Sequence, residues 1–278
     1  MKRHAYVMLG DPVWLRESVG SYYAHVDRIV ATFDERHLGW AGHEIPVSAC
    51  IEILESLDRD RKVELAPGRF VCGTDLMDCE TAQRNASLEL AGAGADWVIQ
   101  LDTDEVLLDA DAFFRAIDAA DEAADALAYP ARWLYASLGG DRYLECSSRW
   151  WRLAASYPGA VAVRAGTKVR HARQVDVDQW RVDFRRKNTD PWHNRSTRVD
   201  AVVTPSQGIA HFAWTRPVED MEAKAAMSGH ANDFDWSDPI SRWKWRSRHP
   251  WLAVAGTPLR AKEHKNWLRV SELKPGFG

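Results

Sequence analysis

The chain has 278 residues and a formal net charge of −4, and 46% of its residues are hydrophobic and 27% are charged. This composition is typical of an ordinary globular protein with a sizeable core. No apolar run approaches the ~18 residues that predict a membrane-spanning helix. The run at residues 5–9 is too short for a secretory signal peptide. We therefore expect a cytoplasmic protein without a transmembrane segment, or at most one peripheral to a membrane.

Strands and helices alternate along the first 125 residues. Apolar runs predict strands at residues 5–9, 28–33, 62–65 and 96–101. Helical spacing of apolar residues predicts helices at residues 14–23, 47–57 and 80–91, and a fourth helix that Asp109 can cap. Strands that alternate with helices indicate an α/β domain with a mostly parallel sheet.

The pattern becomes irregular from Tyr129 onward, with short strand-like runs at residues 160–164 and 199–204. Thr215 is expected to cap a helix that has Pro217 in its first turn and ends at about Gly229. The four cysteines are scattered and form no CxxC pair, so we expect neither a zinc site nor a disulfide. Reduced, partly buried thiols are the expectation for these residues, namely Cys50, Cys72, Cys79 and Cys146.

An acidic turn follows the predicted strand at residues 96–101. Asp102, Thr103, Asp104 and Glu105 come directly after it, and ligands of open parallel sheets bind at the carboxyl ends of the strands. Two carboxylates one residue apart can both face one hard cation such as Mg²⁺ or Mn²⁺, with phosphate oxygens completing the coordination. A solvated turn that caps a helix is the alternative.

The order of helix, strand and acidic turn resembles the family 2 glycosyltransferases. Those proteins show a helix containing A-R-N, a hydrophobic strand and then D-x-D-E, and here residues 82–91 and 96–105 match that order. The resemblance covers about residues 4–125 and implies the GT-A fold, which combines a nucleotide-binding α/β half with a variable acceptor half. It also implies a nucleotide-sugar donor and a metal-dependent, inverting transfer.

The resemblance assigns roles to four residues of this half. Asp34 is similar to the residue that contacts the nucleotide base, and Arg84 is similar to an arginine that holds the donor. Asp102 resembles a residue that contacts the ribose or the metal, and Asp104 resembles the main metal ligand.

Three further residues are expected to bind the donor, namely Gly10, Glu35 and Thr103. The family's first strand usually leads into Pro-x-Tyr/Phe-Asn, whereas this chain has Gly-Asp-Pro-Val-Trp at residues 10–14. This departure leaves the preferred base open.

His211 is the candidate for an added metal ligand. Histidine can complete a carboxylate site, and several GT-A enzymes use a histidine late in the chain in this way. His211 follows the apolar run at residues 208–210 and precedes the helix predicted after Thr215, so it can lie at the edge of the sheet. A histidine bonded within a loop is the alternative.

The catalytic base is expected between residues 176 and 198. An inverting transfer needs a carboxylate near the acceptor hydroxyl to take its proton, and the family places that base in the acceptor half. Asp190 is the candidate and Asp183 the reserve, although each could instead be a surface or capping residue. Arg149 and Arg152 either hold an anionic acceptor or belong to the scaffold.

Charge is unevenly distributed along the chain. Residues 149–198 carry a net charge of +8 and residues 240–278 of +7, whereas residues 1–148 carry −14. The basic segments indicate a polyanionic ligand such as a donor phosphate, a phospholipid or a nucleic acid. Basic residues interleaved with tryptophans after Ile240 suit a single-stranded nucleic acid or an anionic surface. Alternatively, this tail packs its tryptophans on the rest of the protein.

The sequence therefore predicts a metal-dependent glycosyltransferase that uses Mn²⁺ or Mg²⁺. Residues 1–125 would bind the nucleotide sugar, residues 126–239 would bind the acceptor and complete the metal site, and residues 240–278 would form the basic tail. The acceptor is open among a glycan, a lipid-linked molecule and a nucleic acid. The alternatives are a nucleotidyltransferase, a glycosyltransferase acting on modified nucleic acid, and a non-catalytic nucleic-acid- or carbohydrate-binding module.

Overall fold

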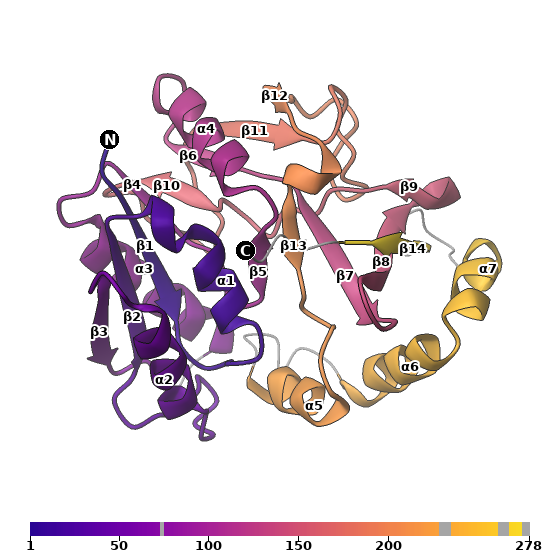
Figure 1. Cartoon of the computed structure of the whole chain (residues 1–278), viewed down its shortest axis with the longest axis horizontal. Helices are drawn as coiled ribbons and strands as arrows, with labels where there is room; N and C mark the ends of the chain where they lie inside the picture. The colour runs from indigo at the N-terminus through magenta and orange to yellow at the C-terminus, as the bar shows by residue number, and fades with distance from the viewer. Residues whose placement is uncertain (73–74, 228–234, 261–266, 274–278) are drawn as a thin grey trace.

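Two β-sheets form the centre of the protein (Figure 1). The computed structural model describes residues 1–72, 75–227, 235–260 and 267–273. Within these ranges an eight-stranded sheet has the order β12-β11-β6-β10-β4-β1-β2-β3. The second sheet has the order β14-β8-β7-β13-β5, with β9 paired to β8.

The N-terminal part is the predicted α/β arrangement. Its parallel strands are β1 (Arg3–Met8), β2 (Arg28–Asp34), β3 (Val63–Gly68) and β4 (Trp97–Ile99). The helices between and after them are α1 (Leu15–Tyr22), α2 (Val47–Leu57), α3 (Leu76–Gly92) and α4 (Ala110–Asp121). The sheet is mostly parallel and is flanked by helices, which confirms the predicted fold class.

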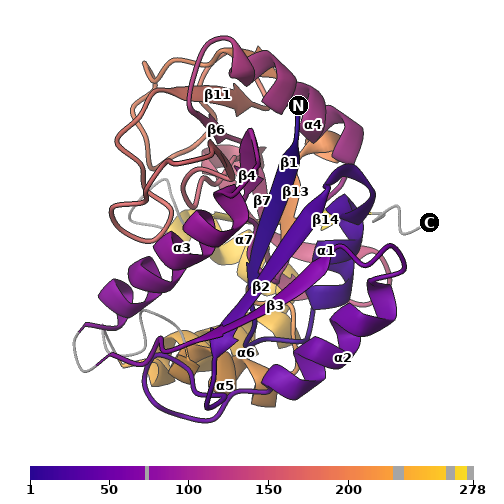
Figure 2. The same cartoon turned by 90° about the vertical axis from the view of Figure 1, so that its left-hand side faces the viewer.

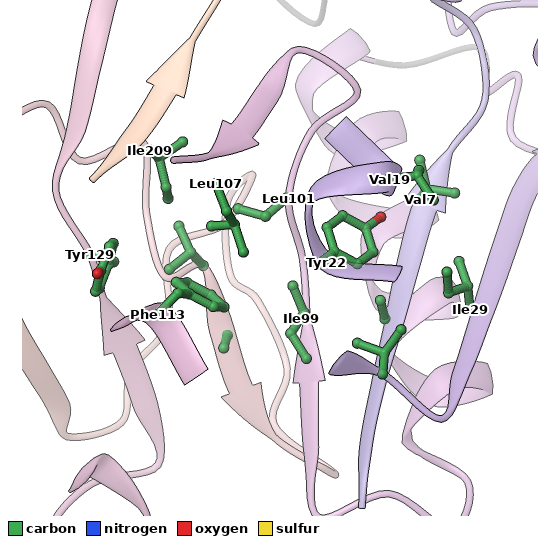
Figure 3. Packing of buried hydrophobic residues seen from close by; sticks show 14 of the residues in the cluster. Val7, Val19, Tyr22, Ile29, Ile99, Leu101, Leu107, Phe113, Tyr129 and Ile209 are labelled. Carbon is green, nitrogen blue, oxygen red and sulfur yellow. The ribbon is translucent and has the colours of Figure 1, made fainter. Parts of the chain in front are cut away.

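Residue alternation along the strands decides which face each helix covers. Val7 of β1 packs in one cluster with Val19 of α1 and Leu54 of α2, whereas the neighbouring Tyr6 packs in another with Leu88 of α3. Figure 2 shows α1 and α2 on one side of β1–β3 and α3 on the other. Figure 3 shows the first cluster from close by. Because both faces are covered at the centre of this sheet, β2 and β4 are buried along almost their whole length.

Aspartates fix the beginnings of two helices. The Asp75 carboxylate accepts a hydrogen bond from the Met77 amide at 2.7 Å, and the Asp109 carboxylate accepts one from the Ala112 amide at 2.8 Å. Such caps satisfy amides that have no partner within the helix. The Asp109 cap is confirmed, and the Asp75 cap makes α3 begin earlier than the predicted residue 80.

The chain after β4 contributes to both sheets. Its strands are β5 (Glu105–Leu107), β6 (Ala126–Ala128), β7 (Ala131–Ser137), β8 (Arg142–Ser148), β9 (Arg152–Leu153), β10 (Ala162–Arg164), β11 (Gln179–Asp183), β12 (Ala201–Val202) and β13 (Ile209–His211). Strand β10 pairs antiparallel with β4 and with β6. The eight-stranded sheet therefore continues across the predicted boundary at residue 125.

The C-terminal segment folds onto the second sheet. It contains α6 (Ser237–Arg248), α7 (Pro250–Arg260) and β14 (Trp267–Glu272), and β14 pairs antiparallel with β8. The indole Nε1 of Trp243 donates to the Tyr135 carbonyl at 2.9 Å. At least one tryptophan of this segment therefore packs on the rest of the protein, as the alternative interpretation of the basic tail expected. In the described parts of the chain, no helix combines the length and the apolarity needed to cross a membrane.

The expected cap at Thr215 is wrong. Helix α5 spans Val218–Met227, and the Thr215 hydroxyl instead donates to the Phe212 carbonyl at 3.0 Å. The turn after β13 takes up this hydroxyl, and the helix begins three residues later. The predicted end at Gly229 lies outside the described residues.

The expectation that the chain has no disulfide is also wrong. Cys72 and Cys79 form a disulfide with Cα atoms 5.8 Å apart. The cap at Asp75 begins α3 between the two cysteines, so Cys79 in the first turns comes back to Cys72 in the preceding loop. Cys50 and Cys146 are free thiols, as expected. Disulfides persist mainly in oxidising compartments, so the bridge does not favour the predicted cytoplasmic location.

Candidate functional site

A cavity of about 440 Å³ lies where several strands end. Its walls come from the ends of β1 and β2, from the segment after β4, and from α3, β13 and α5. This is the carboxyl edge of the parallel strands, where the sequence placed the acidic turn. Its volume is in the range of small-molecule sites. Leu38, Trp40 and Ile45 form part of an apolar wall, and Asp102, Asp104 and Lys224 line the cavity as well.

Two arginines bind Asp102. Its Oδ1 accepts from Nη2 of Arg84 at 2.8 Å, and its Oδ2 lies 3.4 Å from Nη2 of Arg173. Burial raises the pKa of this carboxyl, but Arg173 and Arg84 outweigh burial and lower it to about 2. Asp102 is therefore an anion at neutral pH, and the two guanidinium groups fix the position of its carboxylate.

Glu105 forms a bidentate ion pair with Arg173. Nη1 and Nη2 of Arg173 each lie 2.6 Å from a carboxylate oxygen of Glu105. Both residues are almost completely buried. Glu105 Oε2 also accepts from the Asp102 amide at 3.0 Å. The fourth residue of the acidic turn is thus a support for the turn and not a ligand in the cavity.

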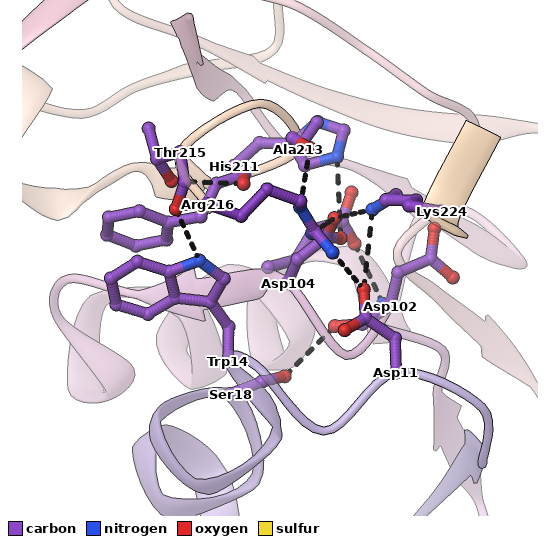
Figure 4. A network of polar contacts seen from close by, with 12 residues as sticks. Asp11, Trp14, Ser18, Asp102, Asp104, His211, Ala213, Thr215, Arg216 and Lys224 are labelled. Carbon is purple, nitrogen blue, oxygen red and sulfur yellow. Dashed lines mark hydrogen bonds and ion pairs between the residues drawn. The ribbon is translucent and has the colours of Figure 1, made fainter. Parts of the chain in front are cut away.

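Asp104 lies in a network of cationic groups (Figure 4). Its Oδ2 accepts from Nη2 of Arg216 at 3.2 Å and from Nζ of Lys224. Its Oδ1 lies 3.5 Å from Nε2 of His211. Burial raises the pKa of Asp104, but Lys224, His211 and Arg216 together hold it well below its ordinary value.

Asp11 shares the same two cations. Its Oδ2 lies 2.6 Å from Nη1 of Arg216 and 3.8 Å from Nζ of Lys224. Arg216 and Lys224 therefore bridge two carboxylates that come from distant parts of the sequence. Sequence reasoning missed Asp11, Arg173, Arg216 and Lys224. Asp11 directly follows the first strand, which was an available signal, whereas no local pattern distinguishes the three cations from other basic residues.

Strand pairing brings His211 to Asp104. Strand β13 pairs antiparallel with β5, with His211 opposite Glu105, and the Phe212 amide donates to the Asp104 carbonyl at 2.8 Å. Burial lowers the pKa of His211, but Asp104 outweighs burial and raises it above its ordinary value. Nδ1 of the ring is buried with no hydrogen-bond partner among the described residues.

Of the other residues predicted to bind the donor, Gly10, Asp34 and Thr103 line the cavity. Asp34 acts there partly as a support, because its Oδ2 accepts from the Phe70 amide at 3.0 Å. Glu35 is not among the lining residues, and its Oε1 instead pairs with Nε of Arg69 at 2.6 Å. It lies in the turn directly after β2.

Asp190, the candidate base, is not among the residues that line the cavity. Its Oδ2 lies 2.5 Å from Nδ1 of His193, and its Oδ1 accepts from the Trp192 amide at 2.8 Å. The reserve candidate, Asp183, accepts from the amide of Thr189 at 3.0 Å. The structure therefore does not bring either carboxylate together with Asp102 and Asp104.

The residues around Asp104 can supply two ligands to a divalent cation. The described residues contain no group of three or more His, Cys, Asp and Glu side chains placed to hold a metal. Asp104 Oδ1 and His211 Nε2 face each other at 3.5 Å, as two neighbouring ligands can. Mg²⁺ and Mn²⁺ sites commonly take one or two protein side chains and fill the remaining positions with phosphate oxygens and water. The donor set fits a cation that is bound together with a phosphate ligand.

The structural comparisons give distant likenesses. No protein-family model matches the chain, and no curated protein matches it. The structure of S. aureus TarS 1-349 matches 94% of this chain and 76% of that chain, at 12% identity and a TM-score of 0.43. The 4-diphosphocytidyl-2C-methyl-D-erythritol synthase of Anaerococcus prevotii matches 59% and 70%, at 10% identity and a TM-score of 0.36. Likenesses at this level carry no argument about function.

Proposed function

We propose that the chain is a glycosyltransferase that takes its sugar from a nucleotide-diphosphate donor bound in the cavity. One observation carries the proposal: the cavity joins an apolar wall to a charged wall at the carboxyl edge of a parallel sheet. A nucleotide has a matching apolar part and charged part, because the two faces of its base are largely apolar and its diphosphate is anionic. The resemblance of residues 82–91 and 96–105 to family 2 glycosyltransferases supports the same activity.

The two walls have different tasks in this proposal. Trp40 and Ile45 contact the base, while Asp102, already oriented by Arg84 and Arg173, accepts hydrogen bonds from ribose hydroxyls. Lys224 lines the charged side and can pair with the diphosphate in place of Asp11 and Asp104. Arg216 is not among the lining residues, and it keeps Asp11 and Asp104 in position from behind the cavity wall. Fixed cations at the leaving group stabilise the charge that develops there as the sugar–phosphate bond breaks.

Asp104 and His211 are the proposed ligands of Mn²⁺ or Mg²⁺. When bound, such a cation neutralises charge on the leaving diphosphate. The residues themselves supply only part of the coordination, so the cation and the diphosphate should bind together. We expect Mn²⁺ alone to bind weakly and to bind far more tightly when a nucleoside diphosphate is present, measured by titration calorimetry. Equal affinity with and without the nucleotide would contradict a shared site.

Hydrolysis of nucleotide sugars by the purified protein tests the activity. A panel of nucleotide sugars with Mn²⁺ should give slow release of one nucleoside diphosphate. Asp104→Asn should reduce this release by about 10²–10³-fold, the usual loss when one charge-stabilising group is removed. The control is Asp111→Asn, the same chemical change at a largely exposed carboxylate on α4, which should leave turnover unchanged.

Each outcome of this assay assigns a class. In a parallel reaction supplied with a nucleoside triphosphate and a sugar phosphate, release of pyrophosphate would identify a nucleotidyltransferase. A folded protein that neither hydrolyses nor binds any donor would contradict the transferase proposal and favour the non-catalytic binding module.

Asp190 as the catalytic base remains a proposal with a separate test. Its contacts to His193 and to the Trp192 amide mean that Asp190→Asn can lower either stability or turnover. If Asp190 takes the acceptor proton, the variant should lose transfer to the acceptor but keep donor hydrolysis and the wild-type unfolding midpoint. A lowered midpoint with unchanged turnover would assign Asp190 to the loop structure.

A further inference from the structure

Helix α7 turns an apolar face to the solvent. Trp251, Leu252 and Leu259 are 66%, 60% and 91% exposed. Exposed positions 251, 255, 258 and 259 share one helical face. The opposite face is the one that packs, since Ala253 clusters with Leu268 of β14. Residues 250–259 contain no charged side chain. An outward face of this kind is unusual for a surface helix, whose polar residues ordinarily face water.

Two further tryptophans lie beside this helix. Trp150 and Trp151 are 58% and 38% exposed, and Nε1 of Trp151 donates to the Val254 carbonyl of α7 at 3.4 Å. Their backbones have φ values of 62° and 56°, a left-handed conformation that side chains of this size rarely adopt. Strained backbone of this kind persists where the surrounding structure enforces it, and it clusters at functional surfaces.

Cations without acidic neighbours in sequence flank these apolar side chains along the chain. Residues 146–163 and 245–259 together contain four Lys/Arg and no Asp/Glu. Arg149 directly precedes the tryptophan pair, Arg152 directly follows it, and Arg248 lies just before α7. All three arginines are exposed. Long basic side chains can keep their charge in the headgroup layer while their stems lie along apolar surface.

We propose that Trp150, Trp151, Trp251, Leu252 and Leu259, here called the α7 surface, bind an anionic lipid bilayer. The helix would lie in the plane of the interface, as helices with one apolar face and flanking Lys/Arg do. Its 11 residues extend only ~16 Å, at about 1.5 Å per residue, so it rests on the bilayer. Figure 1 places α7 at the end of the molecule opposite β3.

The composition of the α7 surface favours lipid over nucleic acid. Tryptophans and arginines serve either ligand, because bases stack on aromatic rings and phosphates pair with cations. Leu252 and Leu259 offer no stacking plane, yet they are among the most exposed apolar residues of the described chain. Exposed leucines gain free energy only when an apolar phase covers them, which a bilayer supplies and a single strand of nucleic acid does not.

Vesicle co-sedimentation of the full chain tests this proposal. Wild type should bind vesicles of equal parts phosphatidylglycerol and phosphatidylcholine, and bind phosphatidylcholine vesicles much more weakly because anionic lipid attracts the basic residues. The variant with Trp251→Ser and Leu252→Ser should lose at least ~10-fold in partitioning to the anionic vesicles, since each change removes a large apolar side chain. The control carries Leu65→Ser and Leu90→Ser, at apolar positions 41% and 42% exposed on β3 and α3.

Three results would overturn the proposal. Wild type could fail to bind either vesicle, or the α7 variant and the control could lose binding equally. Alternatively, wild type could bind single-stranded DNA and no vesicle, with loss in the α7 variant, which would assign the surface to nucleic acid. Both variants should keep the wild-type unfolding midpoint and donor binding, because the substituted side chains are exposed and lie outside the cavity. A loss of vesicle binding can therefore be told apart from a loss of folding and from a failure of the proposed transfer.

Discussion

At the scale of single residues, the acidic turn depends on a buried ion pair as much as on its own carboxylates. Arg173 is 1% exposed and pairs with the fully buried Glu105 while it also faces Asp102. Removing one partner of a buried pair leaves an uncompensated charge in the interior. The position of Asp102 therefore rests on a residue 71 positions further along the chain, in a loop with no local motif.

Arg173→Met should lower the free energy of unfolding by about 3–5 kcal/mol, because Glu105 would be left buried without its partner. Arg170→Met is the matched control, since Arg170 pairs with Asp176 on the surface with 64% of its side chain exposed. It should change stability by less than about 1 kcal/mol. Urea denaturation measures both, and equal effects would contradict a structural role for the buried pair.

The titration of Asp102 should be visible in the pH dependence of stability. Its pKa is lowered to about 2 in the folded protein by Arg173 and Arg84 acting against burial. A carboxyl with a lowered pKa stabilises the fold above its unfolded pKa of about 4 and loses that contribution as the pH falls toward 2. The difference in unfolding free energy between wild type and Asp102→Asn should therefore be constant near neutrality and shrink between about pH 4 and pH 2. A difference that does not change with pH would contradict the ion pairs.

At the scale of elements, the beginning of α3 shows how a cap and a disulfide act together. Asp75 starts the helix, and the bridge between Cys72 and Cys79 closes the loop in front of it. Met77, Glu80, Gln83 and Arg84 then project from the same helix into the cavity. The scattered spacing of the cysteines concealed this pairing, because only the turn at Asp75 brings them together.

Thiol counting tests the bridge directly. The denatured, unreduced protein should react with Ellman's reagent at two of its four cysteines, Cys50 and Cys146, and at all four after reduction. Cys72→Ser should leave three reactive thiols without reduction. It should also lower stability by about 2 kcal/mol, the usual contribution of a bridge that closes a short loop. Four thiols in the unreduced wild type would show that the bridge does not form.

At the scale of the whole molecule, the C-terminal segment is part of the core. Leu268 of β14 is 3% exposed and packs with Leu144 of β8 and Ala253 of α7. Leu268→Ala should lower the free energy of unfolding by about 2–5 kcal/mol, because it removes buried methyl groups and leaves a cavity. Leu259→Ala, at a residue 91% exposed, should change it by less than about 0.5 kcal/mol. Equal small effects would mean that the segment folds separately.

Local sequence pattern determined the α/β arrangement of the first 125 residues. Alternating apolar strands and amphipathic helices encode a parallel α/β layer, and the predicted element boundaries lie within a few residues of the observed ones. It also placed Asp102 and Asp104 at the end of β4, where they line the cavity. The tertiary structure decided what surrounds them. Strand β13 brings His211 to Asp104, and distant segments supply Arg173 to Asp102 and Arg216 and Lys224 to Asp104. A charge can be matched by any basic residue that the fold brings within a few ångströms, so no local spacing identifies its partner.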